Sequence, residues 1–229
     1  MIDLTGDGVL ALWNGVEPSR KAEYDAWHTR EHVAERISVP GMRGARRYVR
    51  LSGPLPEYLT LYALDDTSVL TSEPYRKLLD NPTVWSKSMR PSFRGFMRLA
   101  CRRVMTLGGG LGGALAAAAI DETNLPALRQ AAETLITQPA VTVVHVLARD
   151  PDIPDVPFKI GGDTPAFPNA GAILIESYDD NALSAALPAI KGALGRAVIS
   201  AATLTTYRLA YALDHASLDR IEPMTEWPS

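Results

Sequence analysis

The chain has 229 residues, which is enough for one large domain or two small ones with a sizeable core. Its 46% hydrophobic and 21% charged residues are typical of a globular protein and exclude the disordered and collagen-like classes. A net charge of −3 argues against a broad nucleic-acid surface. These values favour a small-molecule ligand over a polymeric partner.

The chain holds a single cysteine, Cys101, which excludes an intrachain disulfide framework and a zinc site built from several cysteines. The first residues show no basic segment followed by an apolar run, so we expect no secretory signal. The most apolar stretch, 111–120, is too short to span a bilayer. We therefore expect a cytoplasmic protein without a membrane contact.

The first half of the chain predicts strand, helix, strand, strand, helix and strand in that order. The pattern rests on apolar runs, Gly and Pro punctuation and aspartates that can cap a helix. The expected ranges are 9–13, 18–38, 42–51, 57–64, 65–79 and 96–107. This order is the ferredoxin-like βαββαβ unit.

After a glycine-rich joint at 108–113, the same order is predicted again. Its elements are expected at 114–120, 124–137, 141–148, 172–178, from 181 onward with interruptions at Pro188 and Gly192, and at 201–213. The glycines lie between two strands with no Gly-Lys-Ser/Thr after them, which favours a flexible joint over a phosphate cradle. A proline-rich loop at 150–169 is either a surface insertion or a cover for a pocket.

Both predicted units also place an aromatic residue and two aspartates at the same point, in 62–66 and 178–180. A lone unit of this kind leaves one sheet face apolar and open, and a second unit can cover it. We expect an α+β fold in which a tandem duplication of the βαββαβ unit forms a pseudo-dimer within one chain. The first repeat is 1–107, the joint is 108–113 and the second, degenerate repeat is 114–229.

The first predicted helix carries the residues with chemical potential. Projection at about 100° per residue separates an apolar stripe from a face that is both aromatic and ionisable. That second face contains Tyr24, Trp27, His28, Glu31, Ala34 and Glu35, with His32 at its edge. Beneath a pocket, Trp27 would form a wall, while His28, Glu31 and His32 would offer groups for proton transfer.

Two other interpretations of this helix stay open. His28, Glu31 and His32 match the H-x-x-E-H pattern of some zinc peptidases, but the motif is short and a third ligand is missing. Alternatively, both histidines hydrogen-bond within the protein and tie the helix to a strand. We expect neither a metal nor another cofactor here.

Residues 23–33, together with Ile37, Pro40-Gly41-Met42 and Arg46-Arg47-Tyr48, resemble the first helix and second strand of the dimeric α/β-barrel superfamily. The resemblance is closest to its EthD-like and uncharacterised members. Arg98, Cys101-Arg102 and the glycine-rich joint resemble two-repeat bacterial members. The strong similarity covers residues 7–66, and the second half is similar only in its order of strands and helices.

The resemblance implies sheets that meet as a barrel and small, often aromatic or polyketide-like ligands between sheet and helices. Relatives include isomerases, cyclases, cofactor-free monooxygenases and haem enzymes, and many use a histidine as acid or base. The range 124–137 has no counterpart of Trp27 and His28, so chemistry is expected on one side only. Since one fold hosts many reactions, the resemblance assigns no activity.

Several strand residues are further candidates. If their faces turn towards the helices, Arg46 and Tyr48 of one strand and Tyr62 of the next would line a pocket with Tyr24, Trp27 and His28. The alternative for such residues is cross-strand pairing. His145 in an apolar strand is expected to be a satisfied core residue. The basic run is expected to form a solvated or ion-paired face; it contains Arg90, Arg94, Arg98, Arg102 and Arg103.

Two functions therefore compete. The first is a small-molecule enzyme in which His28 transfers a proton beside a carbonyl, as in an isomerase, cyclase or lyase, with Glu31 or His32 orienting it. The second is a non-catalytic ligand-binding or assembly protein on the same scaffold. Homo-oligomerisation stays open in both.

Overall fold

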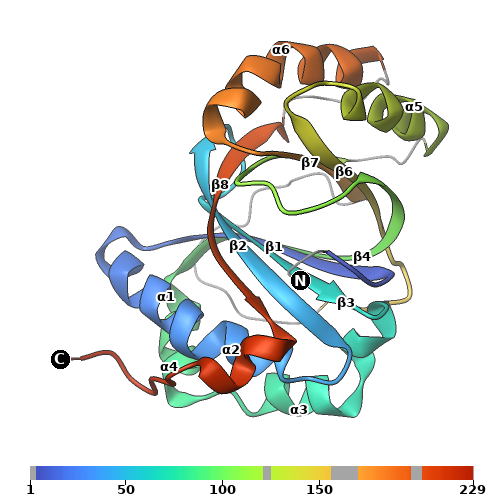
Figure 1. The fold of residues 1–229 in the computed structure, drawn as a ribbon. Coiled ribbons are helices and arrows are strands. Elements are labelled where there is room, and N and C mark those ends of the chain that lie inside the picture. The colour runs from blue at the N-terminus through green and yellow to red at the C-terminus, as the bar shows by residue number, and fades with distance from the viewer. Residues whose placement is uncertain (1–3, 121–124, 156–169, 197–202, 229) are drawn as a thin grey trace.

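A computed structural model describes residues 4–120, 125–155, 170–196 and 203–228. Its strands form a closed barrel with the order β1-β3-β2-β8-β5-β7-β6-β4, shown in Figure 1. The strands are β1 (Gly8–Val16), β2 (Met42–Ser52), β3 (Tyr58–Leu64), β4 (Phe93–Gly108), β5 (Ala114–Ile120), β6 (Val141–Arg149), β7 (Gly171–Ser177) and β8 (Thr205–Asp214).

The barrel closes because β4 and β8 each pair with strands of both halves. β4 pairs with β1 and β6, and β8 pairs with β2 and β5, all antiparallel. Within the barrel each half contributes its strands in the same order, β4-β1-β3-β2 and β8-β5-β7-β6. Closure leaves no open sheet edge, which removes the hazard of edge-to-edge pairing. The mixed α/β architecture and the predicted order of elements are confirmed.

The helices lie at two opposite sides of the barrel in Figure 1, α1 to α4 on one side and α5 and α6 on the other. In the first half they are η1 (Pro18–Arg20), α1 (Lys21–Trp27), η2 (His28–His32), α2 (Val33–Ile37), η3 (Thr67–Thr71), α3 (Glu73–Asp80), α4 (Val84–Met89) and η4 (Arg90–Ser92). In the second half they are α5 (Leu125–Ile136), α6 (Asp180–Arg196) and η6 (His215–Arg220).

Strand alternation divides the core into a barrel interior and two outer layers. On β3, Leu59 and Leu61 point into the barrel with Trp13, whereas Tyr62 packs on the helix side. On the side of α5 and α6 the small side chains of β5 let the helices approach closely. The layer there is filled by apolar residues, including Ala116, Ala118, Leu128, Leu135, Leu183, Ile190 and Leu194.

Three local predictions need correction. The segment after α3, expected to be irregular, contains α4, whose first turn is capped by the hydroxyl of Thr83 accepting from the Ser86 N–H. Neither Pro188 nor Gly192 interrupts α6, which runs from Asp180 to Arg196. The helix expected at 65–79 consists of two pieces, η3 and α3, and Pro74 lies in the first turn of α3, where its missing N–H costs no helical hydrogen bond.

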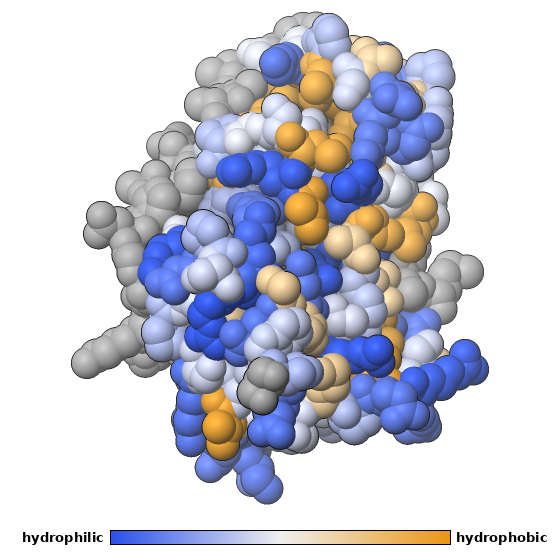
Figure 2. Space-filling model, turned by 90° about the vertical axis from the view of Figure 1, so that its left-hand side faces the viewer, coloured by the Kyte–Doolittle hydropathy of each residue, from blue (hydrophilic) through white to orange (hydrophobic). Residues whose placement is uncertain are grey.

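Other predictions concern residues that lie outside the described part of the chain. Residues 156–169 of the proline-rich loop lie outside them, as do Asn124 and 201–202 at expected element ends. Among the described helices, none combines the length and apolar character needed to cross a membrane. On the face shown in Figure 2, hydrophilic side chains predominate in the lower part and hydrophobic ones occur in small groups above.

Candidate functional site

The first helix contains a π-turn at its centre. The N–H of Val33 donates to the carbonyl of His28, five residues earlier, so η2 holds one residue more than an α-helical turn. Every later position is thereby set back by one residue, a rotation of roughly 100° about the helix axis. As a result Arg36 takes the place on the cavity face that α-helical spacing assigns to Glu35.

This helix covers a cavity of about 70 Å³ on the outer face of the barrel. Aromatic side chains supply much of its wall, and no Asp or Glu lies among its lining residues within the described part of the chain. The lining consists of Leu10, Leu12, Asn14, Tyr24, Trp27, His28, His32, Arg36, Met42, Thr60, Tyr62, Tyr75, Leu79, Ser86, Arg90, Phe93, Phe96 and Arg98.

His28 is the buried ionisable group at the centre of the predicted site, with 3% of its surface exposed. Its Nε2 lies 3.2 Å from the hydroxyl oxygen of Thr60 on β3. Its Nδ1 is buried and has no hydrogen-bond partner among the described residues. Burial, and secondly the charge of Arg47, lower the pKa of His28 well below its usual 6.5. The imidazole is therefore neutral at pH 7, with one ring nitrogen open to a ligand.

Trp27 is held in place by a polar cluster that connects the first helix to α4. Its indole Nε1–H lies 3.1 Å from Oε1 of Glu31 and 3.2 Å from the hydroxyl of Ser86. The hydroxyl of Thr83 donates to the same Glu31 oxygen over 2.6 Å. Glu31 thus positions the tryptophan wall. Its hydrogen bonds do not reach His28, so the expected role in orienting that imidazole is not what the geometry shows.

His32 lines the same cavity and stacks on Trp27, with ring centroids 4.3 Å apart and an interplanar angle of 27°. Its ring centroid is 5.7 Å from that of His28. Burial, followed by the charges of Arg36, His28 and Arg90, lowers its pKa well below 6.5. Both imidazoles are therefore neutral at pH 7.

The tyrosines of the site differ in their hydrogen bonding. Tyr24 donates its hydroxyl to Asn14 over 3.1 Å. Tyr62 is buried against the cavity, and its hydroxyl has no partner among the described residues. Burial raises the pKa of Tyr62, so its hydroxyl stays protonated and can donate a hydrogen bond. Tyr24, Trp27 and Tyr62 line the same cavity as His28, and their role in ligand binding stays a prediction.

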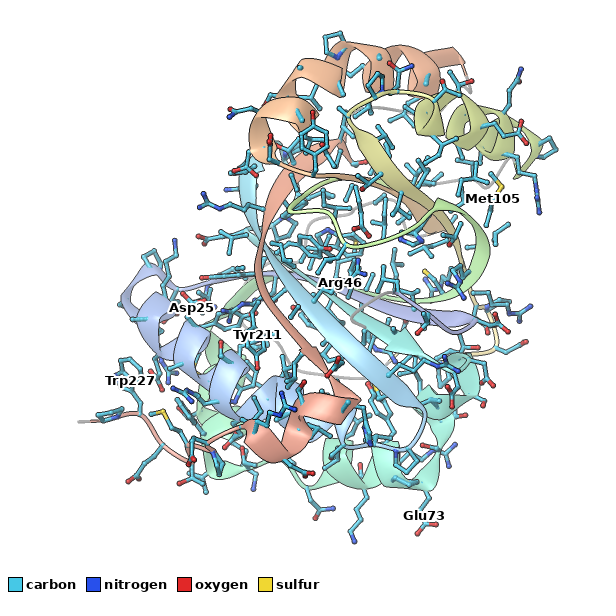
Figure 3. All side chains as sticks on the ribbon, in the orientation of Figure 1. Asp25, Arg46, Glu73, Met105, Tyr211 and Trp227 are labelled. Carbon is cyan, nitrogen blue, oxygen red and sulfur yellow. The ribbon has the colours of Figure 1, made fainter. Side chains whose placement is uncertain are left out.

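Arg46 and Tyr48 do not lie beside His28. Alternation along β2 turns both side chains into the barrel, where Figure 3 shows Arg46 surrounded by strands. Arg46 Nη1 pairs with Oε1 of Glu176 over 2.7 Å. His145 Nε2 lies 3.2 Å from the same oxygen. The expectation that Arg46 and Tyr48 line the pocket is therefore corrected, whereas the expected hydrogen-bonded core role of His145 matches the structure.

Sequence reasoning missed the arginines of the cavity. Arg36 was not predicted to line the cavity, because a projection with a constant helical period does not include a π-turn. Arg90 and Arg98 were assigned to a solvated or ion-paired face, yet both line the cavity. Arg94 and Arg102 do form the expected ion pairs, with Glu17 and with Asp150 and Asp152. Alternation along the strand at 96–107 could have shown that Arg98 shares a face with Phe96.

No protein-family model matches the sequence, and no curated protein matches it significantly. Solved structures do match. An anthrone oxidase-like protein is similar with a TM-score of 0.62 at 11% identity, over 93% of this chain and 95% of the other. A proposed monooxygenase of Fusobacterium nucleatum has a TM-score of 0.57 at 9% identity, over 92% and 95%. A haem-binding protein of Thermus thermophilus has a TM-score of 0.51 at 11% identity, over 94% of each.

The chain has a dimeric α/β-barrel fold. Both sheets of this dimeric α/β-barrel come from one chain, and β4 and β8 cross between them. The identities are too low to transfer an activity, so the site must be interpreted from its own residues.

Within this dimeric α/β-barrel the two helix layers differ. Between the helices and the sheet of the first half lies the His28 cavity. The equivalent layer of the second half is packed with the apolar side chains of α5, α6 and β5. The expectation that chemistry resides in the first half stays a prediction, and the His28 cavity is the observation that favours it.

The described residues do not fit a bound metal ion. No group of three or more His, Cys, Asp or Glu side chains in that part of the chain could hold a metal ion. The zinc interpretation fails locally because Glu31 is occupied by Trp27 and the α4 hydroxyls.

Proposed function

We propose that this protein is a small-molecule enzyme in which His28 transfers a proton to or from a small aromatic or carbonyl substrate, as in an isomerase, cyclase or lyase. The observation that carries the proposal is the buried Nδ1 of His28, which has no protein partner although the ring lines an aromatic cavity. A buried polar atom without a partner is costly, and a substrate group would satisfy it.

The neighbouring groups suit proton transfer beside a carbonyl. With the Nε2 proton donated to Thr60, Nδ1 presents a lone pair that can accept a proton from carbon. The Tyr62 hydroxyl can donate to the carbonyl oxygen as negative charge develops there. Because the His28 pKa is lowered, its imidazolium is a strong acid and returns the proton readily. His32 and Glu31 act indirectly, through the stack and hydrogen bond that fix Trp27.

The experiment measures deuterium exchange at the carbon beside the carbonyl of acetophenone and 2-tetralone in D₂O by proton NMR. We expect the wild-type chain to exchange these protons about a hundredfold faster than His28→Gln, the usual scale of general-base catalysis. Arg30→Gln is the matched control, because Arg30 is exposed on the same helix. Equal exchange in wild type and His28→Gln contradicts the assignment.

A second function is a non-catalytic ligand-binding protein on the same scaffold. It is favoured by the lowered pKa of His28, because a lower pKa makes the imidazole a weaker base for removing a proton from carbon. Ketone binding without exchange in the same experiment would support it.

The finer relationships of the chain are also proposals. The identical strand order of its halves supports a tandem duplication, with repeats at 1–107 and 114–229 around the joint at 108–113. The similarity of residues 23–33 to EthD-like members supports a relationship to that branch.

A further inference from the structure

The His28 cavity carries positive charge at its polar positions. Arg36, Arg90 and Arg98 line it, whereas no carboxylate does so within the described residues. The two histidines contribute no charge at pH 7, because their pKa values lie well below 6.5. The lining itself is therefore basic, and among the described residues the carboxylate of Glu35 pairs with Arg36 from outside the lining. In an apolar surrounding the charge of the arginines acts strongly on an anion.

Arg36 is the arginine with an open donor. Its side chain is 7% exposed, and Nη1 is buried without a hydrogen-bond partner among the described residues. Its Nη2 forms an ion pair with Oε2 of Glu35 at 3.7 Å, a distance too long for a hydrogen bond, so Nη1 is the donor that remains unused. A buried guanidinium with an unused donor is unfavourable, since charged groups are normally buried only when paired and hydrogen-bonded.

The π-turn places the Arg36 side chain on the cavity face of the helix. Without it, α-helical spacing would direct Glu35 towards the ligand, and the cavity would repel an anion. π-Turns are frequent at functional sites, and this one exchanges an acidic for a basic side chain at the cavity.

The rest of the cavity selects the body of the ligand. Phe93 lies 5.9 Å from Trp27 and 6.2 Å from Phe96 between ring centroids, so the three rings pack against one another and form an aromatic wall of the cavity. A groove of about 540 Å³ adjoins the cavity, since Leu79 and Arg90 line both. Arg76, Lys87, Asp80 and Asp155 also line that groove. With Arg90, its lining carries three basic and two acidic side chains and is therefore net basic.

We propose that the cavity binds a small aromatic carboxylate whose carboxylate group pairs with Arg36 and whose ring lies among Trp27, Phe93 and Phe96. A planar guanidinium pairs with a carboxylate through two parallel hydrogen bonds, and one such anion balances one arginine. The inference rests on the proposed function only in taking this cavity as the substrate site. It names the substrate class and makes Arg36 the substrate-binding residue.

The test compares benzoate with benzamide, which has the same shape but no charge, by isothermal titration calorimetry of the full chain at pH 7. We expect benzoate to bind at least about tenfold more tightly, because a hydrogen bond to a charged group contributes more than a neutral one. Arg36→Gln should abolish that difference, Arg36→Lys should restore part of it, and Arg30→Gln should leave it unchanged. Equal affinity for both probes overturns the proposal, and so does a benzoate preference that survives in Arg36→Gln.

Two further comparisons distinguish failure of this inference from failure of the proposed catalysis. If Arg36→Gln fails to fold, wild type is compared with Arg36→Lys instead. A benzoate preference in Arg36→Lys equal to that of wild type contradicts a pair of parallel hydrogen bonds between the guanidinium and the carboxylate. His28→Gln should still bind benzoate, since Arg36 supplies the charge. Benzoate binding without ketone exchange would leave this inference standing and refute the proposed catalysis. His28-dependent exchange without any benzoate preference would do the opposite.

Discussion

The buried ion pair inside the barrel joins the two halves of the chain, and removing its charge should be costly. Arg46 on β2 and Glu176 on β7 are both fully buried and 2.7 Å apart. Glu176 also accepts from the backbone N–H of Gly112 over 2.8 Å, and His145 lies 3.2 Å away. Glu176→Gln keeps the shape of the side chain but leaves the Arg46 charge without its counter-ion.

Breaking one partner of a buried pair costs about 3–5 kcal/mol, because the remaining charge stays desolvated. The amide oxygen of Gln can still accept from Gly112, so we place the loss near the lower limit, about 3 kcal/mol. For a domain of this size that corresponds to a fall in Tm of roughly 6–12 °C. Urea unfolding measures the free energy directly, at pH 7, where a native Glu176 is ionised.

A double-mutant cycle can distinguish loss of the charge pair from poor packing of the Gln side chain. Once Arg46→Met has removed the cation, Glu176→Gln should cost far less, and the coupling should exceed about 1 kcal/mol. Glu133→Gln provides a carboxylate control outside the barrel, because Glu133 is exposed on α5. A loss below about 1 kcal/mol for Glu176→Gln, or strict additivity with Arg46→Met, would refute the argument that charge pairing in the barrel stabilises the fold.

The pH dependence of the pair has a definite sign. Burial opposes ionisation of Glu176, but His145, Arg46 and the Gly112 N–H outweigh it and hold the pKa below its usual value of 4.5. A carboxyl whose pKa is depressed by folding contributes stability above its unfolded pKa and loses it as the pH falls through the folded pKa. Wild type should therefore lose more stability than Glu176→Gln on acidification below about pH 4.5.

Three further predictions concern the first half. In the wild type the unfolding free energy should fall below about pH 6.5, because folding lowers the pKa of His28 and the unfolded chain binds its proton more tightly. His28→Gln should make this fall less steep. Equal slopes of unfolding free energy against pH, measured by urea titration from about pH 7 to 5, would contradict this. Glu31→Gln should weaken the anchoring of Trp27 and change its near-ultraviolet circular dichroism while the far-ultraviolet spectrum persists; an unaltered near-ultraviolet signal would mean that Glu31 does not position the indole. Gly41→Ala should destabilise by about 1–3 kcal/mol, since φ is +89° and a Cβ would lie 2.5 Å from a methyl of Val69; a urea midpoint equal to wild type would count against strain there.

Much of the fold follows from local sequence. Alternating runs such as 57–64 and the glycine-rich punctuation at 108–113 specify strands and breaks through short-range sterics and side-chain periodicity. The cavity face around Trp27 and His28 was likewise predictable, because an aromatic residue beside an ionisable one on a helix is unusual unless both face a pocket.

The tertiary structure decided which side chains meet. A strand sequence gives two alternating faces but does not say which face turns inward, so Arg46 was expected at the pocket and lies inside the barrel. A helix sequence predicts a constant period but not a local π-turn. The position of Arg36 in the cavity therefore could not be predicted from the sequence, because it depends on the π-turn. The sequence by itself determined the order of elements and the His28 helix. Only long-range packing determined the charge of the cavity and the closure of the barrel, since both depend on contacts between residues far apart in the chain.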